Sequence, residues 1–543
     1  MAFETKDKDL LARIGRLESK SGTIETPLFF PVVNPTIQPI SPREIHERFG
    51  CQALITNAYI LKKRFSNEIM KEGLHMFLDF DGTIMTDSGA YQILVYGDIE
   101  TTPKEIVEFQ EQIDTDVATI LDWPTGWKTT REHATQTVNE TLKRAKELFN
   151  IKTRKDILWV GPVQGGQHLD LLARSARGMG RLPFQIHALG SPTEIMEHYR
   201  FDMLVDMIVT AKMNLPIERP LHLFGAGHPF MFGLAVALGC DFFDSAAYAI
   251  YAGKDRYMTE YGTYRMEELE YFPCTCPKCS RTDPKEVSEM TTRKQKVFLA
   301  EHNLYSCQGE LKRIKQAIKH GRLWEHLELR AHGHPTILQA MKRLKKYENF
   351  IEKHSPAMKK HGIFFFDSMG LVRPEVVRHK KKLMERYCPD EKAAILLLIP
   401  EAQMKPSRKS KRSEESFKHL SDLYKQHPSA VHKCFYGAPF GLIPMELDEI
   451  YPLSQCEIAL PLETETIKHV AKQVSDYIHR TNYRSVMMLH NPENWDDNVL
   501  DRCREICRKK NITFKYFDIR REQRKTTLAN LKHHLHKTLS GNP

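Results

Sequence analysis

Short apolar runs alternate with longer amphipathic segments across residues 25–250. Helical spacing of the apolar residues marks the segments 104–114, 130–149 and 192–212. Runs of strand length occur at residues 28–33, 53–56, 83–86, 117–121, 158–163, 184–189, 221–224 and 241–243. Eight strands that alternate with helices favour a (β/α)8 TIM barrel, an α/β fold, over an open sheet.

Polar residues follow the ends of these runs, which is where a barrel of this kind assembles its active site. They are Asn57, Asp87, Ser88, Asp122, Gln164, the Gly190 loop, residues 225–228 and Asp244. Each one taken singly has an alternative role, because Asp, Asn and Ser often cap the helix that follows a strand. Together they predict one pocket rich in carboxylates and amides.

The chain beyond the barrel is predicted to form a second α/β region. Strands are expected at 393–400, 485–489 and 512–519, and helices near 415–427, 464–479 and 497–509. The Ser- and Lys-rich segment 403–416 is expected to be a mobile loop. We therefore expect a barrel domain over 1–345, a helical connector over 346–390 and an α/β accessory domain over 391–543.

The composition is that of an ordinary globular protein, with 543 residues, 41% of them hydrophobic and 27% charged. The first 20 residues are polar and mixed in charge. No apolar run approaches the ~20 residues needed to cross a bilayer. We therefore expect a cytoplasmic protein that has no membrane contact.

Positive charge is distributed unevenly along the chain. The 79 Lys and Arg outnumber the 69 Asp and Glu by ten, yet residues 1–350 hold 45 of each kind. The remaining 34 basic and 24 acidic residues, all beyond residue 350, account for the whole excess. This division predicts chemistry in the front part of the chain and binding of a polyanion behind it, with merely uneven surface charge as the alternative.

Cys274, Cys276 and Cys279 form a C-x-C-x2-C cluster, and 22 residues separate Cys279 from His302. Three thiolates and one imidazole suit Zn²⁺, and four protein ligands leave no position for a substrate or water. The spacing therefore predicts one structural zinc site over 274–302. Free cysteines in a reducing compartment are the alternative, and a zinc hydrolase is disfavoured because the metal would have no open position.

Several short motifs occur in a fixed order on the predicted barrel: TDSGAYQ (86–92), VQGG (163–166), ALG (188–190), DFFDSAAY (241–248) and the cysteine cluster. In this order they resemble the tRNA-guanine transglycosylases over about residues 1–345. HLFGAGHPF (222–230) and the long C-terminal extension look like the archaeal branch of that family. The resemblance implies exchange of guanine 15 in the tRNA D-arm for 7-cyano-7-deazaguanine (preQ0), in archaeosine biosynthesis, with tRNA and the free base as partners.

The resemblance also implies two catalytic residues. Base exchange without hydrolysis needs a group that holds the ribose C1′ after guanine leaves, and a carboxylate can do so as a covalent glycosyl-enzyme. Asp244 matches the family's nucleophile. Asp87 matches its second catalytic carboxylate, and two carboxylates near one site have their pKa values pushed apart, which allows proton transfer during exchange.

Five residues match positions that bind the base in this family: Ser88, Tyr91, Asp122, Gln164 and Gly190. A guanine-like edge needs an acceptor for N1–H and the 2-amino group, which Asp122 supplies. It also needs a donor for O6, which is expected from Gln164 and the backbone N–H near Gly190. Ser88 is expected to add a polar contact, and Tyr91 to stack on the extruded base, with packing at the barrel mouth as its alternative role.

The C-terminal region departs from the archaeal pattern. Members of that branch usually end in a PUA module that binds the acceptor end of tRNA, and none is recognised here. We expect a separate PUA-domain protein, or the basic extension itself, to supply this contact. The enzyme is also expected to be a homodimer.

A second resemblance concerns a paralogue, archaeosine synthase, whose accessory domain is similar to YGAPFGLIPMELDEIYP (436–452). Its P-C-x3-K-P-Y signature reads PEAQMKPS (400–407) in this chain, so Lys405 is expected to be a solvated loop residue. Two alternatives remain, an enzyme like this paralogue and a catalytically silent tRNA-binding subunit. The presence of both Asp87 and Asp244 favours the exchange enzyme.

Overall fold

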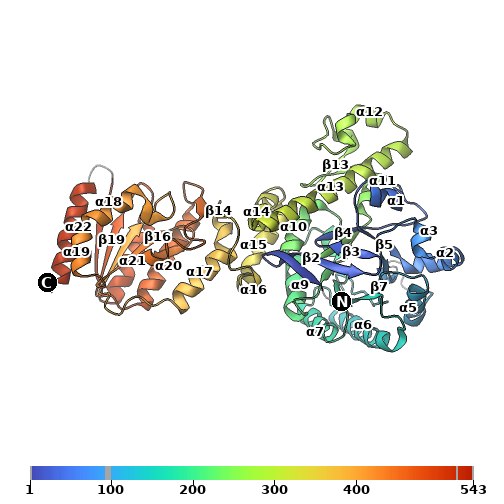
Figure 1. The fold of residues 1–543 in the computed structure, drawn as a ribbon, viewed down its shortest axis with the longest axis horizontal. Coiled ribbons are helices and arrows are strands. Elements are labelled where there is room, and N and C mark those ends of the chain that lie inside the picture. The colour runs from blue at the N-terminus through green and yellow to red at the C-terminus, as the bar shows by residue number, and fades with distance from the viewer. Residues whose placement is uncertain (1–2, 92–99, 521–523, 541–543) are drawn as a thin grey trace. The chain divides into compact units, whose positions relative to one another are not determined.

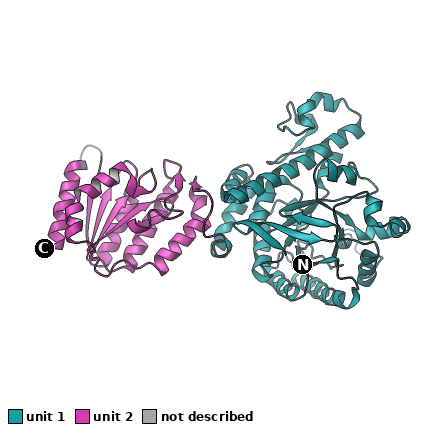
Figure 2. Cartoon of the chain, in the orientation of Figure 1, with its two compact units in different colours: residues 1–355 teal, residues 356–543 magenta. Residues whose placement is uncertain are grey.

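The computed structural model describes residues 3–91, 100–520 and 524–540. It divides the chain into two compact units, residues 1–355 and 356–543, which Figure 2 colours separately. Each unit has its own sheet and its own helices (Figure 1). Over the described ranges, no helix is both long enough and apolar enough to cross a membrane.

The first unit is built on a barrel of eight parallel strands in the order β4-β11-β10-β9-β8-β7-β6-β5. A bridge between Val32, just after β4, and Ile55 of β5 joins the two ends of this sheet. The strands are β4 (Leu28–Pro31), β5 (Ala53–Asn57), β6 (Thr83–Asp87), β7 (Val117–Thr119), β8 (Leu158–Val163), β9 (Ile186–Leu189), β10 (Leu221–Leu223) and β11 (Phe242–Ser245). Every predicted run contributes one strand, so the predicted barrel is confirmed.

Helices lie between and around these strands. They are α1 (Pro42–Glu47), α2 (Ala58–Glu72), α3 (Leu74–Leu78), α5 (Pro103–Gln112), α6 (Arg131–Ile151), α7 (Leu169–Gly180), α8 (Thr193–Glu197), α9 (Phe201–Asn214), α10 (Pro229–Ala237) and α11 (Ala247–Gly253). The predicted helical segment 192–212 forms two helices, α8 and α9. Tyr199, between α8 and α9, has a φ of 55°, a left-handed conformation that interrupts a right-handed helix.

An antiparallel sheet that the hydrophobic pattern did not reveal covers the amino ends of the barrel strands. It consists of β1 (Glu4–Asp9), β2 (Ala12–Ser19) and β3 (Gly22–Glu25). Leu17 and Ile24 of this sheet belong to the same buried cluster as Leu28, Val117 and Leu158, which are the first residues of their strands. This end of the barrel is therefore closed by apolar packing.

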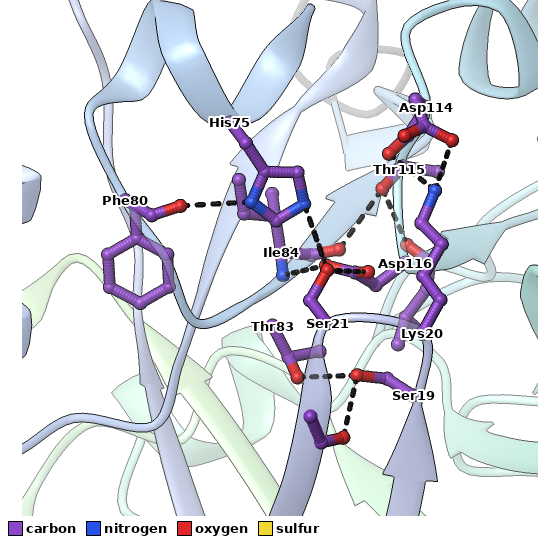
Figure 3. A network of polar contacts seen from close by, with 12 residues as sticks. Ser19, Lys20, Ser21, His75, Phe80, Thr83, Ile84, Asp114, Thr115 and Asp116 are labelled. Atoms are coloured by element: carbon purple, nitrogen blue, oxygen red, sulfur yellow. Dashed lines mark hydrogen bonds and ion pairs between the residues drawn. The ribbon is translucent and has the colours of Figure 1, made fainter.

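A buried polar network strengthens the same end of the barrel (Figure 3). Asp116, fully buried just before β7, accepts hydrogen bonds from the Ile84 N–H at 2.7 Å and from the Ser21 hydroxyl at 2.5 Å. His75 of α3 lies 3.1 Å from the same carboxylate and 2.9 Å from the Phe80 carbonyl. Although burial lowers the pKa of His75, these two contacts raise it overall. The network joins the β2–β3 turn and α3 to the strands.

A short strand pair and five helices follow the barrel within the described part of the first unit. The strands are β12 (Arg256–Met258) and β13 (Thr263–Arg265), and the helices are α12 (Pro284–Ser288), α13 (Thr292–His320), α14 (Leu323–His332), α15 (Pro335–Arg343) and α16 (Glu348–His354). Helix α13 is 29 residues long and packs against α10 and α11 of the barrel. It therefore fixes the loop that precedes it to the barrel wall.

The second unit contains a five-stranded sheet in the order β17-β16-β15-β19-β20. Its strands β15 (Ile395–Pro400), β16 (Val431–Gly437), β19 (Ser485–His490) and β20 (Thr513–Asp518) are parallel, and β17 (Gly441–Pro444) is antiparallel to β16. A separate pair joins β14 (Ile363–Phe365) and β18 (Cys456–Ile458). The helices are α17 (Pro374–Glu385), α18 (Lys411–His419), α19 (Ser421–Gln426), α20 (Thr464–Arg480), α21 (Asp497–Lys509) and α22 (Arg524–Leu539).

Two expectations about segment 403–416 are wrong. The segment is not a loop throughout, because a 3₁₀ turn spans Ser407–Lys409 and α18 begins at Lys411. Lys405 is not solvated, because its ammonium pairs with Glu401 and the two side chains are only 5% and 10% exposed. Glu401 also accepts a hydrogen bond from the Ala438 N–H at 2.7 Å. The pair therefore holds this segment against the carboxyl end of β16.

Candidate active site and metal centre

The carboxyl ends of the parallel barrel strands bring three predicted carboxylates together. Asp87 ends β6, Asp122 follows β7 and Asp244 lies in β11. Burial raises the pKa of Asp87 to about 7, and the charges of Asp122 and Asp244 contribute to this rise. Burial likewise raises the pKa of Asp122 to about 6. A carboxyl group with a pKa near 7 can both hold and release a proton at neutral pH.

Asp244 is held by one of its two carboxylate oxygens. The Nε2 of His222, on the neighbouring strand β10, lies 2.7 Å from Oδ1, and the Gly225 N–H donates to the same oxygen at 3.1 Å. No hydrogen bond from any described residue reaches Oδ2. Because a carboxylate only accepts hydrogen bonds, the imidazole donates from Nε2. The second oxygen is thus available to attack an electrophilic carbon.

His222 is a functional candidate that the sequence reasoning missed. It is 1% exposed and contacts the rings of Phe30 and Phe224, with centroid distances of 5.6 and 4.7 Å. A polar residue inside an otherwise apolar strand run was the signal that could have revealed it. Its hydrogen bond to the predicted nucleophile makes it a candidate positioning residue.

Asn57 both caps a helix and contacts the candidate site, the two roles considered for a polar residue after a strand. Its Oδ1 caps helix α2 by accepting the Ile60 N–H at 2.9 Å. Its Nδ2 donates to Asp87 Oδ2 at 3.1 Å. The cap thereby orients the amide toward the carboxylate, and the same side chain serves the helix and the site.

Asp122 and Gln164 form one hydrogen-bonded pair. Gln164 Nε2 donates to Asp122 Oδ2, and Gln164 Oε1 accepts the Thr125 N–H at 2.9 Å. Gly190 lies against this amide so closely that a Cβ there would be 2.2 Å from Gln164 Nε2. The Gly190 N–H, however, donates to the Val163 carbonyl at 3.0 Å, so Gly190 itself is not the expected free backbone donor. Its contribution is close packing.

Ser88 and Tyr91 occupy different environments beyond β6. The Ser88 side chain is fully buried, and within the described parts of the chain its hydroxyl has no hydrogen-bond partner. A polar ligand atom would satisfy this hydroxyl. Tyr91 is 46% exposed. Burial and the charges of Glu197 and Glu194 raise the pKa of its hydroxyl.

The structure also brings the four predicted metal ligands together. The ligand atoms of Cys274, Cys276, Cys279 and His302 all lie within 4.8 Å of one another. Cys276 Sγ is 3.5 Å from Cys279 Sγ, which is 3.3 Å from His302 Nδ1. Around a tetrahedral metal with sulfur ligands at ~2.3 Å, such edges measure roughly 3.6 to 3.8 Å. The donor set therefore fits a closed tetrahedral metal site.

Two contacts orient the ligands of this site. His302 Nε2 donates to the Met258 carbonyl at 2.8 Å, which leaves Nδ1 unprotonated for a metal. The Tyr257 ring stacks on the imidazole, and its hydroxyl lies 3.3 Å from Cys279 Sγ. The imidazole comes from α13 and the thiols from the loop before it, so a bound metal would tie this loop to the helix.

Comparison with known proteins agrees with this geometry. Residues 7–336 match the family described as "Queuine tRNA-ribosyltransferase", and residues 376–535 match a "Domain of unknown function (DUF5591)". A tRNA-guanine(15) transglycosylase from Saccharolobus solfataricus is 42% identical over 90% of this chain and 96% of its own length. The chain belongs to the tRNA-guanine transglycosylases.

Other members of this family are similarly related. Proteins with the same name from Sulfolobus acidocaldarius and Methanocaldococcus jannaschii are 40% and 42% identical. The matches cover 90% and 88% of this chain, and 95% and 72% of those proteins. The family match spans the whole barrel and the four cysteine and histidine ligands, so this transglycosylase is an enzyme of the transferase class.

Proposed function

We propose that this transglycosylase exchanges guanine 15 in the D-arm of tRNA for 7-cyano-7-deazaguanine, as a step of archaeosine biosynthesis in the cytoplasm. The observation that carries the chemistry is Asp244, which is held through Oδ1 while Oδ2 is left without a hydrogen bond from the described residues. The assignment of position 15 rests on the names of relatives that match nearly the full length of this chain.

In the first half of the reaction, Asp244 Oδ2 attacks C1′ of the target nucleotide. The C1′–N9 bond breaks, and guanine leaves with the bonding electron pair and gains a proton. The product is an aspartyl ester of the ribose, so the tRNA backbone stays intact while the base is absent. His222 and the Gly225 N–H hold the other carboxylate oxygen, which keeps the attacking oxygen directed at the sugar.

In the second half, N9 of the incoming base attacks C1′, and the C1′–oxygen bond to Asp244 breaks. The carboxylate leaves with the electron pair, and the incoming base loses its N9 proton. Asp87 is suited to supply and then accept these protons, because its pKa of about 7 lies near neutral pH. The two half-reactions balance without any oxidant, reductant or water.

Base recognition is proposed for the pair of Asp122 and Gln164. Asp122 accepts from N1–H and the 2-amino group, and the second hydrogen on Gln164 Nε2 donates to O6. The first hydrogen on this nitrogen already fixes the pair through Asp122. Ser88 offers the buried hydroxyl that lacks a partner among the described residues, and Tyr91 covers the extruded base by stacking.

We propose that the metal of the Cys3His site is one structural Zn²⁺. Zinc stabilises a closed tetrahedral site of this composition and supplies no activated water there. We propose tRNA and the free base as ligands, residues 391–543 as a region that binds or positions tRNA, and a homodimer as the working assembly. A separate PUA-domain protein is a further proposed partner.

A base-competition exchange assay tests this function. Purified protein is incubated with tRNA that carries radiolabelled guanine, and release of the label is followed with guanine, 7-cyano-7-deazaguanine or adenine as the competing base. We expect release with the first two bases, from D-arm position 15 and not from the anticodon. Absence of label release with every base would instead support a silent tRNA-binding subunit.

Replacement of Asp87 by Asn is expected to lower the exchange rate by roughly 10²-fold or more, because a proton carrier is lost. The same substitution should increase the free energy of unfolding at neutral pH. The folded-state pKa of Asp87 is raised, so the wild type loses stability as the pH rises from about 4 to about 7. The variant avoids this loss, and its advantage in the free energy of unfolding should grow by roughly 1 kcal/mol or more between pH 5 and pH 8.

Urea unfolding at these two pH values measures the difference, and single-turnover label release measures the rate. Asp170→Asn is a matched control, because Asp170 is an exposed carboxylate paired with Arg131. The control should leave the exchange rate unchanged. A stability difference between Asp87→Asn and the wild type that stays constant from pH 5 to pH 8 would contradict a raised pKa of Asp87.

A further inference from the structure

The positive charge of the second unit is concentrated at its carboxyl-terminal end. Residues 502–543 contain twelve Lys and Arg against three Asp and Glu, a net charge of +9. Residues 356–501 contain 21 against 20. The excess therefore belongs to the second half of α21, to β20, and to the α22 end of the chain.

A groove lies where two of these elements meet. It has a volume of about 490 Å³ and is lined by Arg504, Arg508, Ile512, Phe514, Lys515 and Tyr516. Among the described residues, strand β20 forms one edge of the sheet and pairs with β19 alone. Arg504 and Arg508 lie one turn apart on α21, so both guanidinium groups reach the same groove.

The side chains of the groove combine cations with an exposed ring. The Arg504 guanidinium lies 5.8 Å from the centroid of the Tyr516 ring, which is 47% exposed. Arg504 is paired with Asp501 at 2.7 Å, whereas Arg508 forms no ion pair with the described residues. Phe514 and Ile512 supply apolar surface. The groove thus presents both positive charge and a flat aromatic face.

Roles in stabilising the helix and the sheet edge explain only some of the side chains that line the groove. Basic residues in the last turn of a helix favour its dipole, and Lys on an edge strand discourages pairing with other strands. Neither role calls for a half-exposed tyrosine beneath an arginine. An aromatic face beside cations is the combination that binds unstacked nucleotides, because the ring stacks on a base while the cations contact phosphates.

We propose that this groove binds a single-stranded segment of tRNA, with one base on Tyr516 and the flanking phosphates on Arg504 and Arg508. The bases of a duplex are stacked on one another and cannot lie against a ring, so the groove should prefer unpaired RNA. This inference deepens the proposed function, on which the choice of tRNA rests.

Binding of fluorescein-labelled RNA to the full chain tests the proposal. The probes are a single-stranded RNA of about ten nucleotides, a hairpin of the same composition, and tRNA. The pair Arg504→Gln and Arg508→Gln should raise the Kd for the single strand ~10-fold or more. It should also reduce the slope of log Kd against log salt by about 1.4, since each phosphate contact in a single strand contributes ~0.7.

Two further variants address the ring and the net charge. Tyr516→Ala should raise the same Kd by roughly 5- to 100-fold, and Tyr516→Phe should restore binding because the stacking face is kept. The control pair Lys468→Gln and Lys472→Gln removes two exposed charges from α20, and one of them, as in the groove pair, has an acidic partner. This control should change the Kd less than 2-fold.

The proposal would be overturned if the groove double variant and the control double variant lost equal RNA affinity. It would also be overturned if the wild type bound the hairpin as tightly as the single strand. Unchanged RNA affinity in all groove variants would overturn it too and would point to β20 as an edge for pairing with a protein strand. Circular dichroism confirms that each variant is folded.

The same variants separate this inference from the proposed function. At saturating tRNA the groove variants should release labelled guanine at the wild-type kcat, because the groove residues do not take part in the chemistry. A protein that binds single strands through the groove but never exchanges guanine would refute the proposed function alone. Normal exchange with groove-independent RNA binding would refute the groove alone.

Discussion

Asp244→Asn is expected to abolish guanine exchange, with a loss of at least ~10³-fold, while tRNA still binds. An amide is too weak a nucleophile to displace the base, so the variant should not form the aspartyl ester. The asparagine carbonyl can still accept from His222 and the Gly225 N–H, so the variant should fold. Single-turnover release of labelled guanine measures the loss.

A denaturing gel provides a second readout for the same variant. Wild-type protein mixed with tRNA and a poorly competing base should form an RNA–protein adduct that survives denaturation, and Asp244→Asn should form none. Asp170→Asn, which alters an exposed carboxylate, should form the adduct normally. Wild-type exchange or adduct formation by Asp244→Asn would refute the assignment of the nucleophile.

Cys276→Ser is expected to destabilise the part of the first unit around the metal site. A structural zinc site of this composition contributes folding free energy directly, by roughly 10 kcal/mol or more in small zinc peptides. In this chain the metal would connect the cysteine loop to α13, which packs on the barrel. We expect a Tm at least ~10 °C lower and less than one zinc per chain by elemental analysis.

The control for this experiment is Cys388→Ser, because Cys388 is an exposed cysteine outside the cluster. Its Tm and zinc content should equal those of the wild type. At temperatures where Cys276→Ser remains folded, it should still exchange guanine. A folded, metal-free variant with no exchange activity would contradict a purely structural role for the metal.

The barrel was predictable because its strands are short apolar runs separated by helices. Burial on both faces leaves few polar residues within the runs, so strands such as β8 (Leu158–Val163) are visible in the sequence. The β1–β3 sheet is different. Its first strand, Glu4–Asp9, is mostly exposed and rich in charge, and its pairing rather than its composition makes it a strand.

Individual residues of the candidate site could be predicted from the sequence only where they belong to a recognisable motif or follow a predicted strand. Asp87, Asp122 and Asp244 lie at or just beyond the carboxyl ends of strands, and their mutual electrostatic influence could be anticipated from the barrel alone. The bond from His222 to Asp244 could not, because it depends on which side chains of adjacent strands face each other. The same holds for Lys405, whose burial depends on a partner, Glu401, four residues away in a folded turn.

The sheet that covers the amino ends of the strands has a consequence for the order of events. Leu17 and Ile24 pack over that end of the barrel, so we expect molecules to enter from the opposite side, at the strand ends that hold the carboxylates. On the proposed reaction, the departing guanine and the arriving base must use this one entrance and one binding position in turn. Exchange then follows a ping-pong order, in which the released base itself competes with its replacement.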